Sequence, residues 1–303
     1  MTSATRPLRR AVHGVLVLDK PVGPSSTQAL SAAKRLFGAL KAGHGGTLDP
    51  MASGILPVLF GEATKFAQQG LDADKTYVAT VALGQQTDTG DAEGQVISSH
   101  PVSVDQQQLE RVLSAQLGVQ QQTPPMYSAL KHQGRPLYEY ARAGQTVDKP
   151  ARQIHIHQID LLSYDAPTAV IRVHCSKGTY IRVLAQTIGE QLGCGAHLSA
   201  LRRTGVGSLQ IEQSFSLESL DRMDAKAREA CLMPVDALAN DWPMAALSDD
   251  QVQELRFGRS IAWTDPVTSK LRLYDGHQHF VGIGQVVDHQ LMPVRLTAQT
   301  IFH

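Results

Sequence analysis

The order of apolar and polar positions along the chain predicts an alternation of short strands and amphipathic helices. Apolar runs at 14–20 and 75–84 are typical of strands. Between them, residues 25–38 place apolar side chains at helical spacing, after a serine that can act as the N-cap and before Gly38. We therefore expect a helix here that packs one face against its neighbours.

Similar patterns continue to about residue 240 and then change. Further helices are expected at 61–69, 104–118, the second half of 122–144, 181–192 and 216–230. Beyond this, short extended runs are separated by Asp275-Gly276 and Asp288-His289, which suit hairpin turns. The pattern predicts an α+β part, residues 1–244, and a small β-rich part, residues 245–303.

Composition indicates a globular protein of a reducing compartment. The 303 residues are 42% hydrophobic and 18% charged, and no apolar run has the length of a membrane span. The first residues lack the apolar core of a secretory signal, so export is not expected. The three cysteines are too far apart for a paired metal or redox motif, which favours the cytoplasm.

The net charge is zero, but the charges are unevenly distributed. Residues 1–43 contain seven basic residues and the single acid Asp19, and residues 171–203 contain five basic residues and the single acid Glu190. Such clusters are typical of a face that binds a phosphate backbone, and equally of ordinary solvated surface charge. Charge alone does not distinguish these two interpretations.

The most unusual local stretch is GHGGTLDPMASG, residues 43–54, which places one carboxylate, Asp49, in a glycine-rich loop. A simple turn would use the same residue types. A phosphate-binding loop would need a Lys-Ser or Lys-Thr pair after the glycines, and none follows. A metal site would need a third ligand beside His44 and Asp49; HIH (155–157) and HQH (277–279) are interpreted as strand faces.

A second acidic stretch, TDTGDAEG at 87–94, contains the Asp-Thr-Gly tripeptide of aspartic proteases. Those enzymes need two carboxylates that share a proton, so one copy would require a homodimer. The polar residues before the tripeptide differ from the hydrophobic lead of those enzymes, and the spacing does not fit a calcium loop. We therefore interpret this stretch as a polar turn.

Asp49 also fits a nucleophile in a pocket built largely by backbone. Gly43, Gly45 and Gly46 permit positive φ and a close approach of a planar ligand, and Pro50 fixes the chain after the carboxylate. His44 offers a ring that can stack on a base. A buried carboxylate stays ionised only beside a cation, and SKGTYIRV offers Arg182. A purely structural ion pair would use the same arginine.

Five blocks of the sequence together resemble the bacterial tRNA pseudouridine-55 synthases, the TruB family. They occur in family order through residues 14–207: GVLVLDKPVGPSS, GHGGTLDPMASGILPV, DKTYVATVALGQQTDTGDAEG, QTPPMYSALKHQGRPLYEYAR and CSKGTYIRVLAQTIGEQLGCGAHLSALRRTGVG. One departure is Gly45, where the family more often has Thr or Ser. The resemblance implies a mixed, mainly antiparallel sheet flanked by helices. HFVGIGQV in the tail is similar to a small β-barrel-like, PUA-like RNA-binding domain.

The resemblance also implies roles for particular residues. Asp49 would be the nucleophile, Tyr77 would stack on the target base and assist proton transfer, and Arg182 would pair with Asp49. Further residues expected to bind the substrate are His44, Tyr180, Leu201, Lys20 and Met126. The reaction would isomerise uridine to pseudouridine in the T loop of tRNA, at position 55, with no cofactor and no metal.

Partners and location follow from the same resemblance. The expected partner is the T stem-loop of tRNA, whose target base would flip out of the loop; we expect no membrane and no required protein partner. A cytoplasmic monomer is the simplest expectation. A non-catalytic RNA-binding or RNA-folding factor with the same fold is the alternative, and an intact set of Asp49, Tyr77 and Arg182 argues against it.

Overall fold

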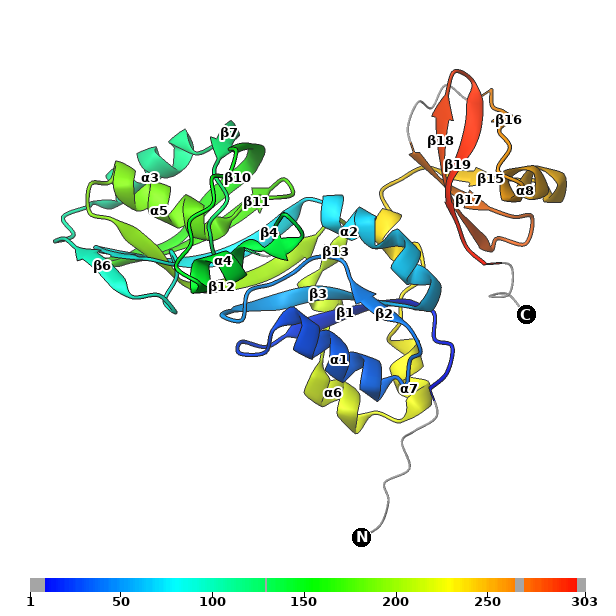
Figure 1. Cartoon of the computed structure of the whole chain (residues 1–303), viewed down its shortest axis with the longest axis horizontal. Helices are drawn as coiled ribbons and strands as arrows, with labels where there is room; N and C mark the ends of the chain where they lie inside the picture. Colours follow the sequence, from blue (N-terminus) through cyan, green and yellow to red (C-terminus); the bar gives the residue numbers. More distant parts are fainter. Residues whose placement is uncertain (1–8, 129, 265–269, 299–303) are drawn as a thin grey trace, which may run out of the picture.

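The computed structural model describes residues 9–128, 130–264 and 270–298. Within these residues, the strands form a ten-stranded sheet, a five-stranded sheet and two small two-stranded sheets. Figure 1 shows the large sheet running through the body of the molecule and the five-stranded sheet in a separate lobe near the C-terminus. None of the helices in the described ranges has the length and apolar character needed to cross a bilayer.

The large sheet has the order β14-β1-β3-β12-β4-β11-β10-β7, with β2 paired to β3 and β13 paired to β12. Its strands are β1 (Gly14–Lys20), β2 (Ala42–His44), β3 (Ala52–Phe60), β4 (Lys75–Leu83), β7 (Gly118–Gln122), β10 (Arg152–Asp165), β11 (Thr168–Cys175), β12 (Ala196–Val206), β13 (Leu209–Gln210) and β14 (Phe215–Ser216). Only the pairs β1–β14 and β3–β12 are parallel. The predicted mixed, mainly antiparallel sheet is confirmed.

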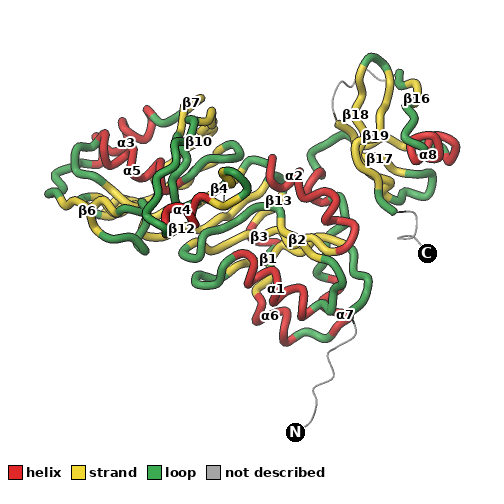
Figure 2. Tube along the Cα trace, in the orientation of Figure 1, coloured by secondary structure: helices red, strands yellow, loops and turns green. Residues whose placement is uncertain are grey.

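Helices cover the sheet in two groups, as Figure 2 shows. The first group packs against β1 and β3 and consists of α1 (Ser26–Leu36) and α6 (Leu217–Arg222). The second packs around β4, β10 and β11 and consists of α3 (Gln106–Ala115) and α5 (Ile181–Gln191). The predicted helices α1 and α3 each begin after an N-cap residue. The Ser25 side chain accepts a hydrogen bond from the Gln28 N–H, and the Asp105 side chain accepts one from the Gln108 N–H.

Two predicted helices differ from the structure. The helix expected at 61–69 begins as a 3-10 helix, η1 (Gly61–Phe66), and is followed by the short α2 (Ala67–Asp72). The single helix expected at 216–230 is wrong, because α6 ends at Arg222 and α7 (Ala225–Ala230) begins anew. Met223 is extended there, and Asp224 caps α7, so an N-capping residue interrupts a continuous helical pattern.

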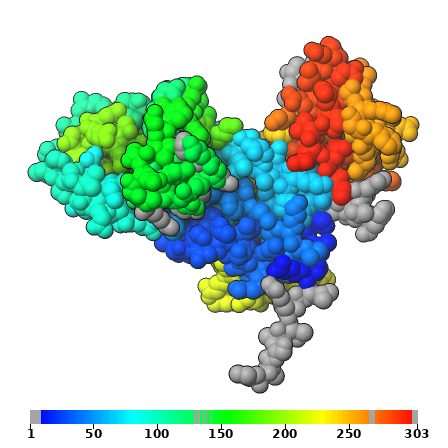
Figure 3. All heavy atoms as spheres, in the orientation of Figure 1, coloured from blue at the N-terminus to red at the C-terminus, as the bar shows by residue number. Residues whose placement is uncertain are grey.

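The C-terminal lobe stands out from the body in the space-filling view (Figure 3). Its sheet consists of β15 (Met244–Ala246), β17 (Lys270–Tyr274), β18 (Phe280–Val287), β19 (Gln290–Leu296) and β16 (Ile261–Ala262), and one helix, α8 (Asp249–Arg256), packs on it. The predicted hairpin at Asp288-His289 is confirmed, with φ of 48° and 60° at the two residues. The HQH segment lies in the turn between β17 and β18, so its interpretation as a strand face is wrong.

The loop that carries Asp49 lies at the centre of the large sheet. It connects β2 to β3, and the first residue of β3, Ala52, pairs with Leu201 of β12. On its other side, β12 pairs with β4, which places Leu201 opposite Ala79 and Arg203 opposite Tyr77. Residues far apart in sequence therefore meet around this loop.

Candidate active site

The Asp49 loop is held by contacts to the start of α1. The Ser26 hydroxyl accepts from the Leu48 N–H at 2.8 Å and donates to the Leu48 carbonyl at 3.0 Å. The Gly23 N–H donates to the Pro50 carbonyl at 2.9 Å. Of the three glycines that could take positive φ, Gly46 does so, with φ of 141°. The backbone on both sides of Asp49 is therefore fixed before any ligand binds.

The guanidinium of Arg182 joins three segments of the chain. The side chain belongs to the first turn of α5 and is only 5% exposed. Its Nη2 lies 3.0 Å from Oδ2 of Asp49, and its Nη1 lies 3.4 Å from Oδ2 of Asp91. Nη2 also donates to the Tyr127 carbonyl at 2.6 Å, and Nη1 donates to the Thr89 carbonyl at 3.1 Å. Asp49 thus has a fixed cationic partner.

Asp91 is a site residue that the sequence patterns did not reveal. It lies in TDTGDAEG, which does form a turn, but its side chain is buried and faces Arg182. The Thr89 hydroxyl donates to Oδ1 of Asp91 at 2.7 Å, and the Glu93 N–H donates to the same oxygen at 3.1 Å. Turn composition gave no sign of this burial. The one available signal was the need of a buried arginine for more than one acceptor.

The Asp49 carboxylate is partly open to solvent, with 39% of its side chain exposed, so a reactant can reach it. The surrounding protein partly desolvates it and raises its pKa above the ordinary value. The positive charge of Arg182 opposes this increase, and the negative charge of Asp91 adds to it. The ionisation of Asp49 is therefore set first by desolvation and then by two neighbours of opposite charge.

Tyr77 and Leu201 form a buried apolar surface beside this loop. They lie on the neighbouring strands β4 and β12, and both side chains belong to the core that α3 and α5 cover. Burial raises the pKa of Tyr77, and the charge of Asp49 contributes to the increase. The tyrosine is therefore a neutral hydroxyl on an aromatic ring, suited to stacking and to hydrogen bonding.

Three further residues predicted to bind the substrate are His44 on β2, Tyr180 at the start of α5, and Met126. His44 has a buried Nδ1 that has no hydrogen-bond partner in the described part of the chain, and burial lowers its pKa, so the ring is neutral. Tyr180 is the N-cap residue of α5, and its N–H donates to Oε1 of Gln122 at 2.7 Å. Met126 directly precedes Tyr127, whose carbonyl accepts from Arg182.

Lys20 is also close to Asp49, but its ammonium faces the interior. The residue is fully buried at the end of β1. Its Nζ donates to the carbonyls of Pro21 and Pro24, both at 2.8 Å, and to that of Pro50 at 3.5 Å. Lys20 therefore supports the backbone of Pro21, Pro24 and Pro50, and its ammonium donates to carbonyls within the protein.

Four residues of the basic clusters noted in the sequence are not free surface charges. Lys20, Arg182 and Arg203 are buried, and Arg202 pairs with Asp19 at 2.7 Å. The density of charge along a chain does not determine side-chain direction, because neighbours on a strand point to opposite faces. Part of this positive charge therefore lies beneath the Asp49 loop.

Two further features lie outside this site. No group of three or more described His, Cys, Asp or Glu side chains has the geometry of a metal site.

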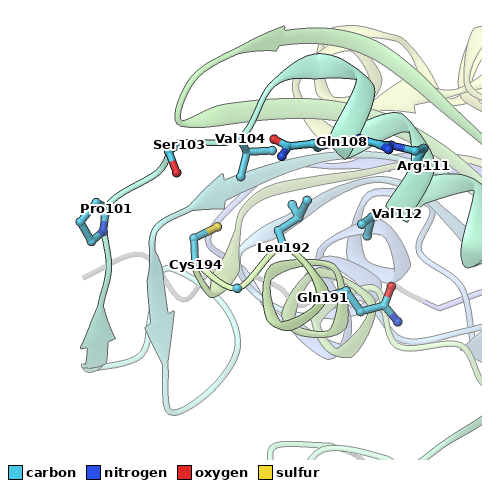
Figure 4. A pocket seen from close by; sticks show the side chains of 10 residues that line it. Pro101, Ser103, Val104, Gln108, Arg111, Val112, Gln191, Leu192 and Cys194 are labelled. Atoms are coloured by element: carbon cyan, nitrogen blue, oxygen red, sulfur yellow. The ribbon is translucent and has the colours of Figure 1, made fainter.

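A pocket of about 360 Å³ lies between α3 and the end of α5, and Figure 4 shows Arg111 and Cys194 among its lining residues. This pocket is at the opposite end of α5 from Arg182, and the side chains that line it include no carboxylate.

Solved structures define the class of protein to which this architecture belongs. A chain in "Crystal Structure of a Cbf5-Nop10-Gar1 Complex" is 25% identical, with a TM-score of 0.75, and the match covers 98% of this chain and 90% of that chain. A chain in "Crystal structure of the archaeal box H/ACA sRNP Nop10-Cbf5 complex" is 23% identical, with a TM-score of 0.71, covering 95% and 86%. The architecture is the pseudouridine synthase fold.

Family models and close relatives then identify the family. The model "TruB family pseudouridylate synthase (N terminal domain)" matches residues 34–181, "tRNA pseudouridylate synthase B C-terminal domain" matches 182–240, and "Pseudouridine synthase II TruB, C-terminal" matches 243–297. The tRNA pseudouridine synthase B of Cupriavidus pinatubonensis is 52% identical over 299 residues, covering 95% of both chains. That of Azoarcus sp. strain BH72 is 50% identical over 290 residues, covering 96% of both.

The chain belongs to the TruB family of tRNA pseudouridine synthases, which are isomerases. The resemblance noted in the sequence is thereby confirmed.

Proposed function

We propose that this enzyme isomerises the uridine at position 55 in the T loop of tRNA and that Asp49 is its nucleophile. The observation that carries the proposal is the half-open Asp49 carboxylate, 3.0 Å from a buried guanidinium and at the edge of the surface formed by Tyr77 and Leu201. A carboxylate, a cation that keeps it charged and a ring for stacking are what this reaction needs from a protein.

In the proposed reaction the bond between N1 of uracil and C1′ of ribose breaks, the base rotates, and C5 bonds to C1′. C5 loses its proton and N1 gains one, so substrate and product have the same composition and no oxidant or cofactor is consumed. Asp49 can act by attack at C1′, by addition at C6 or by removal of a ribose proton. Each route needs an ionised carboxylate beside the sugar, which Arg182 favours.

The RNA must present its base outside the stack. Flipping a uridine out of a folded loop costs a few kcal/mol, and phosphate contacts together with stacking offset this cost. We propose that Tyr77 receives the base, that His44, Tyr180, Leu201 and Met126 surround it, and that residues 245–303 form a PUA-like RNA-binding domain beside the catalytic domain, residues 1–244. Lys20 would act from beneath, through the Pro50 carbonyl. We further propose a cytoplasmic monomer that requires no protein partner.

The direct test is to incubate the protein with an unmodified tRNA transcript and to map pseudouridine chemically. Product at position 55 is expected, and an isolated T stem-loop should compete for the enzyme. Tight binding of tRNA without product would favour the alternative, a non-catalytic RNA-binding factor. Product at another position would reject the assignment of the T loop.

Tyr77→Phe is expected to bind the T stem-loop within about twofold of the wild-type affinity, because the ring that stacks is kept. Tyr77→Ala is the matched control and should weaken binding about tenfold, since stacking on an aromatic ring contributes roughly 1–3 kcal/mol per base. Fluorescence anisotropy with labelled RNA measures both. A collapse of binding in the phenylalanine variant would instead assign the main contribution to the hydroxyl.

Asp91→Asn is expected to move the acid limb of kcat/KM to lower pH. The reaction needs ionised Asp49, whose pKa is raised above its ordinary value, and the negative charge of Asp91 is one cause of that increase. Removing this charge lowers the pKa, so Asp49 is ionised at a lower pH than in wild type. The pH profile of kcat/KM reports groups of the free enzyme. An acid limb that stays in place or moves upward would contradict this account.

A further inference from the structure

A second arginine, Arg203, lies beneath the Asp49 loop and is the most deeply buried charged side chain of β12, at 1% exposure. Its Nε donates to the Ile55 carbonyl at 2.8 Å. Its Nη2 donates to the Gly46 carbonyl at 3.1 Å, and its Nη1 donates to the Thr47 carbonyl at 3.3 Å. These acceptors come before and after Asp49 in the chain, so one guanidinium joins both arms of the loop.

No described Asp or Glu forms an ion pair with Arg203. The two acids nearest to the site, Asp49 and Asp91, pair with Arg182 instead. A buried cation without a carboxylate partner is costly, and here backbone carbonyls take the place of the missing anion. A charged group in such surroundings needs a reason beyond general stability, because an apolar side chain would fill the same space at less cost.

The backbone around Arg203 is arranged to bring it under the loop. Gly54 of β3 has φ of 100°, and a Cβ at this position would lie 2.2 Å from the Arg203 carbonyl oxygen. Gly46 has φ of 141°, and a Cβ there would lie 3.6 Å from Nη1 of Arg203. The close approach at Gly54 thus involves the backbone of Arg203, and the unusual turn at Gly46 lies against its guanidinium.

Arg203 also influences the groups around the site. Burial raises the pKa of Tyr77, and the positive charge of Arg203 opposes the increase. Burial lowers the pKa of His44 and lowers that of Lys75 to about 8, and in both cases the charge of Arg203 contributes. The guanidinium therefore influences several groups around the Asp49 loop although it is itself buried.

We propose that Arg203 is a positioning residue, which sets where the Asp49 carboxylate lies relative to Arg182 and Tyr77 by holding the carbonyls of residues 46, 47 and 55. An arginine suits this task because its planar fork donates in several fixed directions and remains charged when buried. A lysine keeps the charge but offers one compact ammonium, which cannot reach both arms of the loop in the same geometry. The proposal rests on the proposed role of Asp49.

The test compares Arg203→Lys with Arg202→Lys, two identical substitutions at adjacent residues. Arg202 is 42% exposed and pairs with Asp19, so its replacement serves as the matched control. Four properties are measured in each variant: kcat, the Kd for the T stem-loop RNA, thermal unfolding, and the pKa of Asp49 in the free protein by ¹³C NMR. The Asp49 signal is assigned from its absence in Asp49→Asn.

For Arg203→Lys we expect kcat to fall about 100-fold, since a displacement of about 1 Å in a reacting group has an effect of this size. The Kd for RNA should stay within about threefold, because Arg203 is buried and its donors are taken by backbone carbonyls. The Asp49 pKa should rise further, as its contact with Arg182 loosens. Arg202→Lys should match wild type in all four properties.

If Arg203→Lys folds and keeps wild-type kcat and an unmoved Asp49 pKa, the proposal is overturned. It is also overturned if the variant loses activity only in proportion to the fraction of its molecules that are unfolded. Should this variant not fold, Gly46→Ala strains the backbone whose carbonyl accepts from Arg203, because Gly46 has φ of 141°. Wild-type kcat with an unmoved Asp49 pKa in that variant would then overturn the proposal. If wild-type protein makes no pseudouridine, the proposed function fails, while the NMR titration still tests the positioning role of Arg203.

Discussion

Asp49→Asn is expected to reduce pseudouridine formation by at least about 10⁴-fold, because the amide has no anionic oxygen to act on the ribose or the base. The side chains are nearly equal in size, so folding and RNA binding should be retained. The surroundings raise the pKa of Asp49 and so favour its neutral form. Replacing the carboxylate by a neutral amide should therefore destabilise the fold less here than at a solvated position. Single-turnover conversion of unmodified tRNA measures the effect.

Asp165→Asn is the matched control for this experiment. Asp165 ends β10 at an exposed position, and its replacement should leave the rate within about twofold of wild type, as surface substitutions usually do. A rate for Asp49→Asn within tenfold of wild type would remove Asp49 from the chemistry. Loss of RNA binding together with the rate would instead indicate a role in folding or binding.

Arg182→Met is expected to lose both activity and stability. It removes the cation that favours ionised Asp49 and leaves Asp91 buried without a counter-ion. Breaking a buried ion pair by removing one partner typically costs about 3–5 kcal/mol in the free energy of unfolding. We expect a loss of this size in chemical denaturation and a decrease in kcat of roughly 10³-fold.

The double variant Arg182→Met/Asp91→Asn separates these two effects. Removing the buried charge of Asp91 should restore part of the stability, because the uncompensated anion is then absent. Activity should stay low, since Asp49 still lacks its cation. Recovery of activity together with stability would show that Arg182 acts only through folding.

The apolar and polar pattern of the sequence determined most of the local structure. The strand at 14–20 and the helix after Ser25 follow from short-range preferences and from an N-cap within the same segment. The break at Met223-Asp224 does not show in the apolar pattern, because a capping aspartate and a helix-surface aspartate look alike in one sequence. The five family blocks identified the family, since their order and combination are specific even where single motifs are not.

The sequence also pointed to Asp49 and Arg182 as a pair, 133 positions apart in the chain and 3.0 Å apart in space. It gave no account of Asp91 or Arg203, because composition describes a turn or a basic cluster but not the direction of each side chain. In β12, the adjacent Arg202 and Arg203 point to opposite faces, one to Asp19 and the other beneath the Asp49 loop.

Only the tertiary structure decided which charges are buried and what they contact. Local sequence sets the period of a strand and the start of a helix, since those preferences act between near neighbours. The environment of a charged group depends on strands and loops that pair across the whole chain, here β3, β4 and β12. The residues of the Asp49 loop were therefore evident from the sequence, and the arrangement that fixes the carboxylate emerged from long-range pairing.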